Sequence, residues 1–167
     1  MDNTQQTKSN SMVLAVAYLT FGITYTIIPG LLMSATIGSF VSHMPYLLTI
    51  IGGIAAIVLG IREFKLNEPD PKGKAIASLF FGCIGIIIYV IMYKMTETFI
   101  QQTGEGAIGG FGLLFSSPIP IGFGVLGLIS GIIVLKSDKR NLAIVGIILS
   151  IISVAFPIYI ISNLLFL

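Results

Sequence analysis

Few residues of this chain combine a type and a spacing that could do chemistry. The single cysteine, Cys83, could be a nucleophile, but it lies in an apolar stretch, which disfavours the reactive thiolate. The single histidine, His43, could bind a metal, but no cysteine or carboxylate pair is near it. Glu97 and Glu105 are eight residues apart, so acid–base catalysis by this pair is possible but unsupported. Together these residues predict a protein that is not an enzyme and binds no metal or other cofactor.

The elements that must position these residues are membrane-spanning helices. The chain is 55% hydrophobic and 10% charged, whereas soluble domains are about 25% charged. Its apolar residues fall in long uncharged blocks, whose lengths are close to the roughly 20 residues that a helix needs to cross a bilayer. Within these blocks apolar and polar residues do not alternate, as they would in the strands of a membrane β-barrel. We therefore expect an all-α integral membrane protein with spans at 12–28, 46–61, 75–93, 111–135 and 141–166.

These five runs contain no ionisable residue, which disfavours proton-coupled transport. Between the first two runs, segment 29–45 is apolar but contains Pro29 and Pro45, so it either lies along the membrane interface, which we favour, or lengthens the first span. Segment 95–110 is predicted to be a flexible connector with a short helix, or else a recognition surface. Pro118 and Pro120 are expected to break the fourth run and give it a re-entrant or interfacial lead-in.

The basic residues predict the orientation. Eight of the nine lysines and arginines fall on one side of the predicted spans, and only Lys94 falls on the other. Because basic residues in short loops stay in the cytoplasm, residues 1–11 are expected to be a cytoplasmic tail and the C-terminus to lie outside. Residues 12–167 would form a single transmembrane domain. Carboxylates dilute the basic side, so we expect contact with membrane lipid and no nucleic-acid binding.

An internal repeat is visible in the spacing of small residues. Gly53, Ala56, Gly60 and Lys65 have the same spacing, 3, 4 and 5, as a second set. That second set is Gly124, Gly127, Gly131 and Lys136. Repeat units of about 52–88 and 123–156 predict a five-span bundle made of one leading helix and two repeated transmembrane hairpins.

Small residues also recur at helical spacing on four of the spans, where they allow close helix contact in lipid. We expect them either to pack the hairpins internally, which we favour, or to form a docking face for a membrane protein partner or a second copy. The residues are Gly52, Ala56, Gly60, Ser78, Gly82, Gly127, Gly131, Gly146 and Ser150.

Residues 72–153 resemble a bacterial membrane domain of unknown function that is built from two spans rich in small residues. The pattern is G-x-A-x-A-G-x-x-x-G-x-x-G followed by a glycine-rich helix and a basic turn; residues 75–78 fit it, whereas Asn141, Val145, Ser150 and Ser153 depart from it. The resemblance implies this fold in a bacterial plasma membrane and implies no activity.

Two functions stay open on the sequence. The first is a non-enzymatic membrane protein that acts through helix–helix interaction, such as an accessory, sensor or immunity-type subunit. The alternative is a small channel or transporter for an uncharged solute or ion, with a path beside the break at Pro118 and Pro120.

Overall fold

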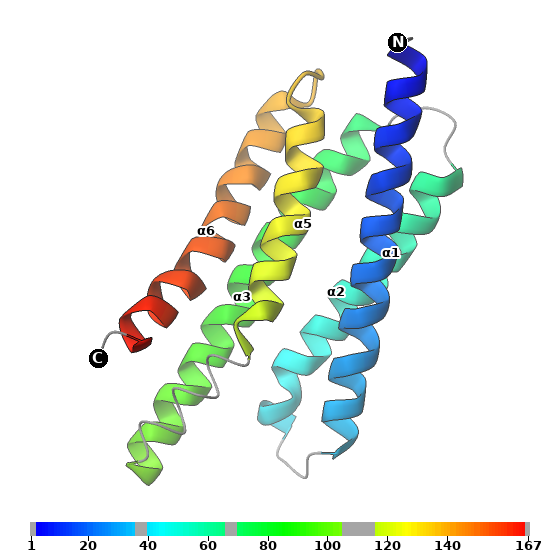
Figure 1. Cartoon of the computed structure of the whole chain (residues 1–167). Helices are drawn as coiled ribbons and strands as arrows, with labels where there is room; N and C mark the ends of the chain where they lie inside the picture. The colour runs from blue at the N-terminus through cyan, green and yellow to red at the C-terminus, as the bar shows by residue number, and fades with distance from the viewer. Residues whose placement is uncertain (1–2, 36–39, 66–69, 105–115, 166–167) are drawn as a thin grey trace.

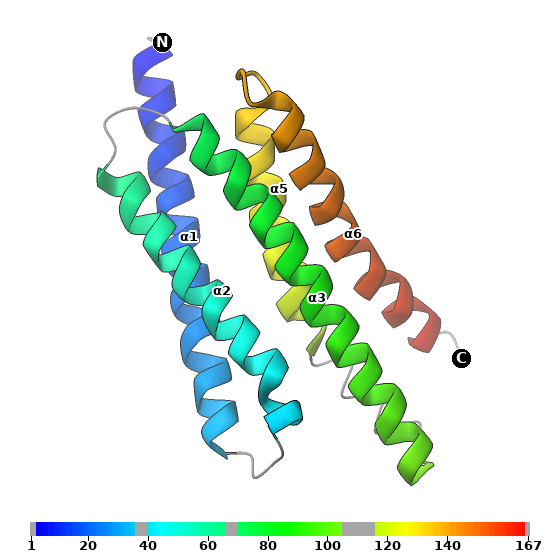
Figure 2. The same ribbon diagram turned by 180° about the vertical axis from the view of Figure 1, so that it is seen from behind.

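The computed structural model describes residues 3–35, 40–65, 70–104 and 116–165. These residues form five helices, which Figures 1 and 2 show from opposite sides. In chain order they are α1 (Asn3–Ala35), α2 (Phe40–Lys65), α3 (Pro71–Thr103), α5 (Pro118–Val134) and α6 (Arg140–Leu165).

Four of these helices are long and apolar enough to cross a membrane. Their candidate spans are Met12–Leu31, Met44–Lys65, Pro71–Thr103 and Arg140–Asn163. The fifth helix, α5, is apolar but has only 17 residues, which corresponds to about 26 Å at 1.5 Å per residue. The all-helical fold expected from the sequence is confirmed among the described residues, and the four long apolar helices are compatible with a multi-pass membrane protein.

The helices pack as two units. Helix α1 packs chiefly on α2, and we call this pair the hairpin unit, whereas α3, α5 and α6 pack on one another as the three-helix unit. Contacts between the units are sparse and involve α2 with α3 and α1 with α5. The expected hairpin of the second and third helices is thus not a packing unit equivalent to α5 and α6.

The segment expected at the membrane interface is divided between two long helices. Helix α1 continues through Pro29 to Ala35, and α2 begins at Phe40. Our favoured interpretation of an interfacial helix over 29–45 is therefore wrong for the described residues, and the alternative of a lengthened first helix holds. Proline inside a helix is tolerated in membrane proteins because packing against neighbours offsets the lost hydrogen bond, and Pro29 is buried.

Most of the described part of segment 95–110 is also helical, rather than a flexible connector. Helix α3 extends to Thr103 and ends where Gly104 adopts a left-handed conformation, with φ of 70°. Its amide donates to the carbonyl of Ile100 over 2.8 Å, which closes the helix. Residues 105–110 and the expected lead-in over 111–115 lie outside the described residues.

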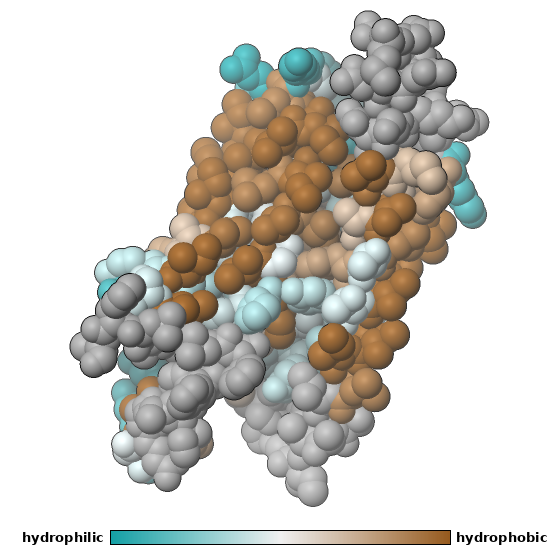
Figure 3. Space-filling model, viewed as in Figure 1, coloured by the Kyte–Doolittle hydropathy of each residue, from teal (hydrophilic) through white to brown (hydrophobic). Residues whose placement is uncertain are grey.

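One end of the molecule gathers the starts of α1, α3 and α6 and the ends of α2 and α5 (Figure 1). We call it the basic end, because Arg62, Lys65, Lys136 and Lys139 lie there. The space-filling view in Figure 3 shows hydrophilic surface at this end above α5 and α6, and apolar surface along the helices below it. The C-terminal end of α6 points away from the basic end.

Candidate functional site at the contact of the two helical units

Six of the nine small residues singled out from the sequence meet inside the three-helix unit. A Cβ atom at Gly131 would lie 2.5 Å from Ile147 of α6, and one at Gly82 would lie 2.9 Å from Leu149 of the same helix. Side chains larger than hydrogen do not fit at such distances, so the backbones are in close contact. Ser78 and Gly82 of α3 and Ser150 of α6 lie against Gly127 of α5, and Gly146 of α6 lies against Ser78. The six residues are Ser78, Gly82, Gly127, Gly131, Gly146 and Ser150.

The other three small residues belong to the hairpin unit. A Cβ atom at Gly60 would lie 2.8 Å from Leu19 of α1, and Ala56 is fully buried. Gly52 instead faces the other unit, since its Cβ would lie 2.5 Å from the ring of Phe123. All nine residues therefore contact the chain's own helices, and the face of Gly127 and Gly131 is already covered by α3 and α6.

Large aromatic side chains, rather than small residues, fill much of the contact between the two units. The ring of Phe123 on α5 lies 5.0 Å from that of Phe21 and 5.4 Å from that of Tyr25, both on α1. Phe81 on α3 adds ring contacts at 6.0 Å to Phe123 and 5.7 Å to Tyr18. Edge-to-face and offset pairs of this kind are worth about 0.5–1.5 kcal/mol beyond burial.

Hydrogen bonds from tyrosines also join the units. The Tyr18 hydroxyl donates to Ser130, because the single hydroxyl proton of Ser130 is used in a 2.6 Å bond to the carbonyl of Leu126. Tyr25 donates to the carbonyl of Pro118 over 2.8 Å. The first turn of α5, where the sequence suggested a break, is therefore tied to α1.

A buried ion pair joins α2 to α3 at the basic end. The ammonium of Lys74 lies 3.1 Å from a carboxylate oxygen of Glu63, and the two side chains are only 4% and 8% exposed. Beside them, Asp70 pairs with Arg62 and caps α3 by accepting a 3.0 Å bond from the amide of Gly73. These residues hold the start of α3 against the end of α2.

This pair was not predicted from the sequence, because both residues lie outside the uncharged runs and were assigned to a connection between spans. The positions of Glu63 and Lys74 on their helix faces would have indicated that both are buried. Glu63 follows Ala56 and Gly60 at spacings of seven and three, and Lys74 precedes Ser78 by four. Both charges thus fall on the faces that carry the buried small residues, one turn beyond the uncharged runs.

Beside the ion pair, a cleft of about 370 Å³ lies between α2 and α3. Its walls are Ala55 and Val58 from α2 and Ile76, Ala77 and Phe80 from α3, with Arg62 at the basic end. The walls are almost entirely apolar. We call it the α2–α3 cleft.

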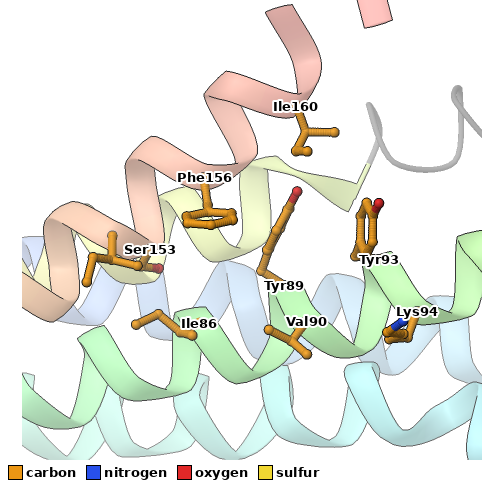
Figure 4. Close-up of a pocket in the computed structure, with 9 residues that line it drawn as sticks. Ile86, Tyr89, Val90, Tyr93, Lys94, Ser153, Phe156 and Ile160 are labelled. Atoms are coloured by element: carbon orange, nitrogen blue, oxygen red, sulfur yellow. The ribbon is translucent and has the colours of Figure 1, made fainter. Parts of the chain in front are cut away.

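A second cavity of about 320 Å³ lies between α3 and α6, toward the end opposite the basic end. Figure 4 shows Tyr89 and Tyr93 of α3 extending toward Phe156 and Ile160 of α6 across it, and Lys94 also lines it. We call it the α3–α6 groove.

The residues that suggested chemistry are not brought together. Cys83 is a free, partly buried thiol on α3, and Glu97 pairs with Lys94 over 2.7 Å on the exposed part of that helix. His43 belongs to α2, and Glu105 lies outside the described residues. Within the described ranges, no three histidine, cysteine or acidic side chains are grouped as metal ligands would be.

Comparisons of the chain with protein-family models, with curated proteins and with solved structures found no match. The resemblance to a two-span bacterial domain therefore stays a prediction.

Proposed function

We propose that this chain is a non-enzymatic, multi-pass protein of a bacterial plasma membrane that acts by binding another transmembrane helix. It would serve as an accessory, sensor or immunity-type subunit. The observation that carries the proposal is the α2–α3 cleft, which lies between two helices that share few contacts and has apolar, partly small-residue walls.

The chemistry of the cleft suits a helix in lipid. Lipid tails are as apolar as leucine, so helices associate there through close packing, which small residues allow. Ala55 and Ala77 line the cleft, and its rims carry Val58 and Ile76, which are 59% and 50% exposed. Large side chains of a partner helix can fill the space between these rims.

Two further features belong to the proposal. We place the basic end in the cytoplasm, with the C-terminus outside, because the start of α1, the basic end of α2 and the basic turn between α5 and α6 share that end. We also treat α5 as a fifth crossing, and the repeated spacing of small residues as an ancient duplication whose copies now pack differently.

Photo-crosslinking tests the proposal. A photoreactive amino acid placed at Val58 or Ile76, in the membrane of the native cell, should give a discrete crosslinked product. The same residue at Val145 or Ile148 provides the matched control, because these α6 side chains are 48% and 52% exposed on a face outside the cleft. Equal products at all four positions, or none at the cleft rims, would overturn the proposal.

A cleft-filling variant sharpens the result. Ala55→Phe should remove the product formed at Ile76, whereas Ile129→Phe, on an exposed part of α5, should leave it unchanged. A product of twice the monomer mass identifies the partner as a second copy. Persistence of the product in a correctly inserted Ala55→Phe protein would rule out the cleft as the docking site.

A further inference from the structure

The α3–α6 groove contains a buried hydroxyl that has no partner. Tyr89 is 7% exposed, and its hydroxyl makes no hydrogen bond. An unsatisfied polar group costs free energy in an apolar site, so a native protein that keeps one there often supplies its partner from a ligand. Figure 4 shows the Tyr89 ring between Phe156 and Tyr93, with its oxygen pointing toward Ile160.

The other hydroxyl-bearing side chains in the groove are either paired or exposed. Ser153 donates to the carbonyl of Pro120 over 2.9 Å, and Tyr93 is 38% exposed, so Tyr89 carries the buried, unpaired hydroxyl among the groove residues that the structure describes. The remaining walls are apolar, with Ile86 and Val90 on α3 and Ile152 on α6. A ligand of this groove therefore needs a long apolar part and one hydrogen-bond acceptor.

The depth of Tyr89 suits the ester region of a phospholipid. Lys74 and Lys94 are 20 residues apart on α3, or about 30 Å, which is the thickness of the hydrocarbon layer. Tyr89 lies five residues before Lys94, or about 7 Å deeper along the same helix. A lipid with its headgroup at Lys94 would place its ester carbonyls near the Tyr89 hydroxyl and its chains along the groove.

The charges at the mouth of the groove select the headgroup. Lys94 and Glu97 form an exposed ion pair at 2.7 Å, so the mouth offers one cation and one anion side by side. A phosphate can bind the ammonium of Lys94 while a headgroup amine binds the carboxylate of Glu97. An anionic headgroup without an amine would instead meet the repulsion of Glu97.

We propose that the α3–α6 groove binds a zwitterionic, amine-bearing phospholipid, whose ester carbonyl accepts a hydrogen bond from Tyr89. An acyl chain gains nothing from apolar walls alone when it leaves a bilayer that is equally apolar. The polar contacts at Tyr89, Lys94 and Glu97 therefore provide the selectivity. This site is on a different surface from the α2–α3 cleft and does not depend on the function proposed for that cleft.

The test uses the purified full chain in lipid discs that contain a trace of phosphatidylethanolamine with a diazirine on one acyl chain. After photolysis, mass spectrometry should find the label concentrated in residues 86–94 and 152–160. Unlabelled phosphatidylethanolamine should compete more effectively than phosphatidylglycerol with the same chains. Labelling spread evenly over all helices, or equal competition by the two lipids, would overturn the proposal.

Two variants with a matched control test the polar contacts. Tyr89→Phe should reduce labelling by about two- to tenfold, the value of one neutral hydrogen bond. Tyr159→Phe removes the same group from an α6 side chain that is 64% exposed outside the groove, and should change nothing. Glu97→Gln should abolish the preference for phosphatidylethanolamine. Unchanged labelling in Tyr89→Phe, or an unchanged preference in Glu97→Gln, would show that the assigned contacts are wrong.

Discussion

The ion pair of Glu63 and Lys74 makes the sharpest prediction about stability. Lys74→Met keeps most of the side-chain volume and removes the charge, which leaves the Glu63 carboxylate buried at 8% exposure. Breaking a buried pair by removing one partner costs about 3–5 kcal/mol of the free energy of unfolding. Glu63→Gln should be destabilising for the same reason, because it leaves the ammonium of Lys74 without its carboxylate.

The magnitude follows from the distance. At 3.1 Å, two unit charges attract by about 5 kcal/mol if the effective dielectric constant is about 20. Desolvation of both groups offsets most of this attraction, so removing both charges at once should be close to neutral. The double variant Glu63→Gln/Lys74→Met is therefore expected to be more stable than either single variant, with a coupling energy of about 3 kcal/mol or more.

The assay is the temperature at which the detergent-solubilised protein loses its monodisperse elution. With about 2–4 °C per kcal/mol for a chain of this size, each single variant should lose about 6–20 °C. Lys139→Met is the matched control, because its pair with Asp138 is 43% and 71% exposed and should be worth little. If the double variant is as unstable as the worse single variant, or if the single variants match the control, the reasoning about this pair is refuted.

Two further predictions concern packing and orientation. Gly131→Leu should lower the unfolding temperature in the same assay by the equivalent of about 1–3 kcal/mol or more, because the new Cβ would lie 2.5 Å from Ile147 of α6. Gly30→Ala should instead stabilise the protein by about 0.5–1 kcal/mol, because its Cβ would have no atom within 4 Å. Similar temperature shifts in the two variants would contradict the close packing of Gly131 on α6. In a Cys83→Ala background, an impermeant thiol reagent should label Gln102→Cys in intact cells but not Asp138→Cys, and the opposite pattern would reverse the proposed orientation.

Hydropathy alone predicts the helices well, because a long uncharged run has few other stable structures in lipid. The pairing of the helices is not predictable in this way. Small residues stand at similar spacing on several helices, so the spacing shows that each can pack closely but not against which neighbour. Gly60 packs on α1 and Gly131 on α6, although the repeat places them at equivalent positions.

The predicted ends of the first and third helices were wrong because they relied on local signals, a proline and a run of polar residues. Pro29 suggested an end to the first helix, but Pro29 is buried and α1 continues to Ala35. The polar residues of 95–103 suggested a connector, yet glutamine and glutamate are good helix formers, and the helix stops only at Gly104. Glu63 and Lys74 were missed because charge was taken as a sign of exposure.

The division into two units sets an order of assembly during synthesis. The hairpin unit consists of the first two helices, so its contacts are complete before α3 leaves the ribosome, and chains fold from the N-terminus as they emerge. The helices on which α3 mainly packs, α5 and α6, are in contrast synthesised last. In that interval the pairing of Lys74 with Glu63 is available to hold the start of α3 against the hairpin unit, so a contact whose removal as a whole costs little stability can still direct the nascent chain.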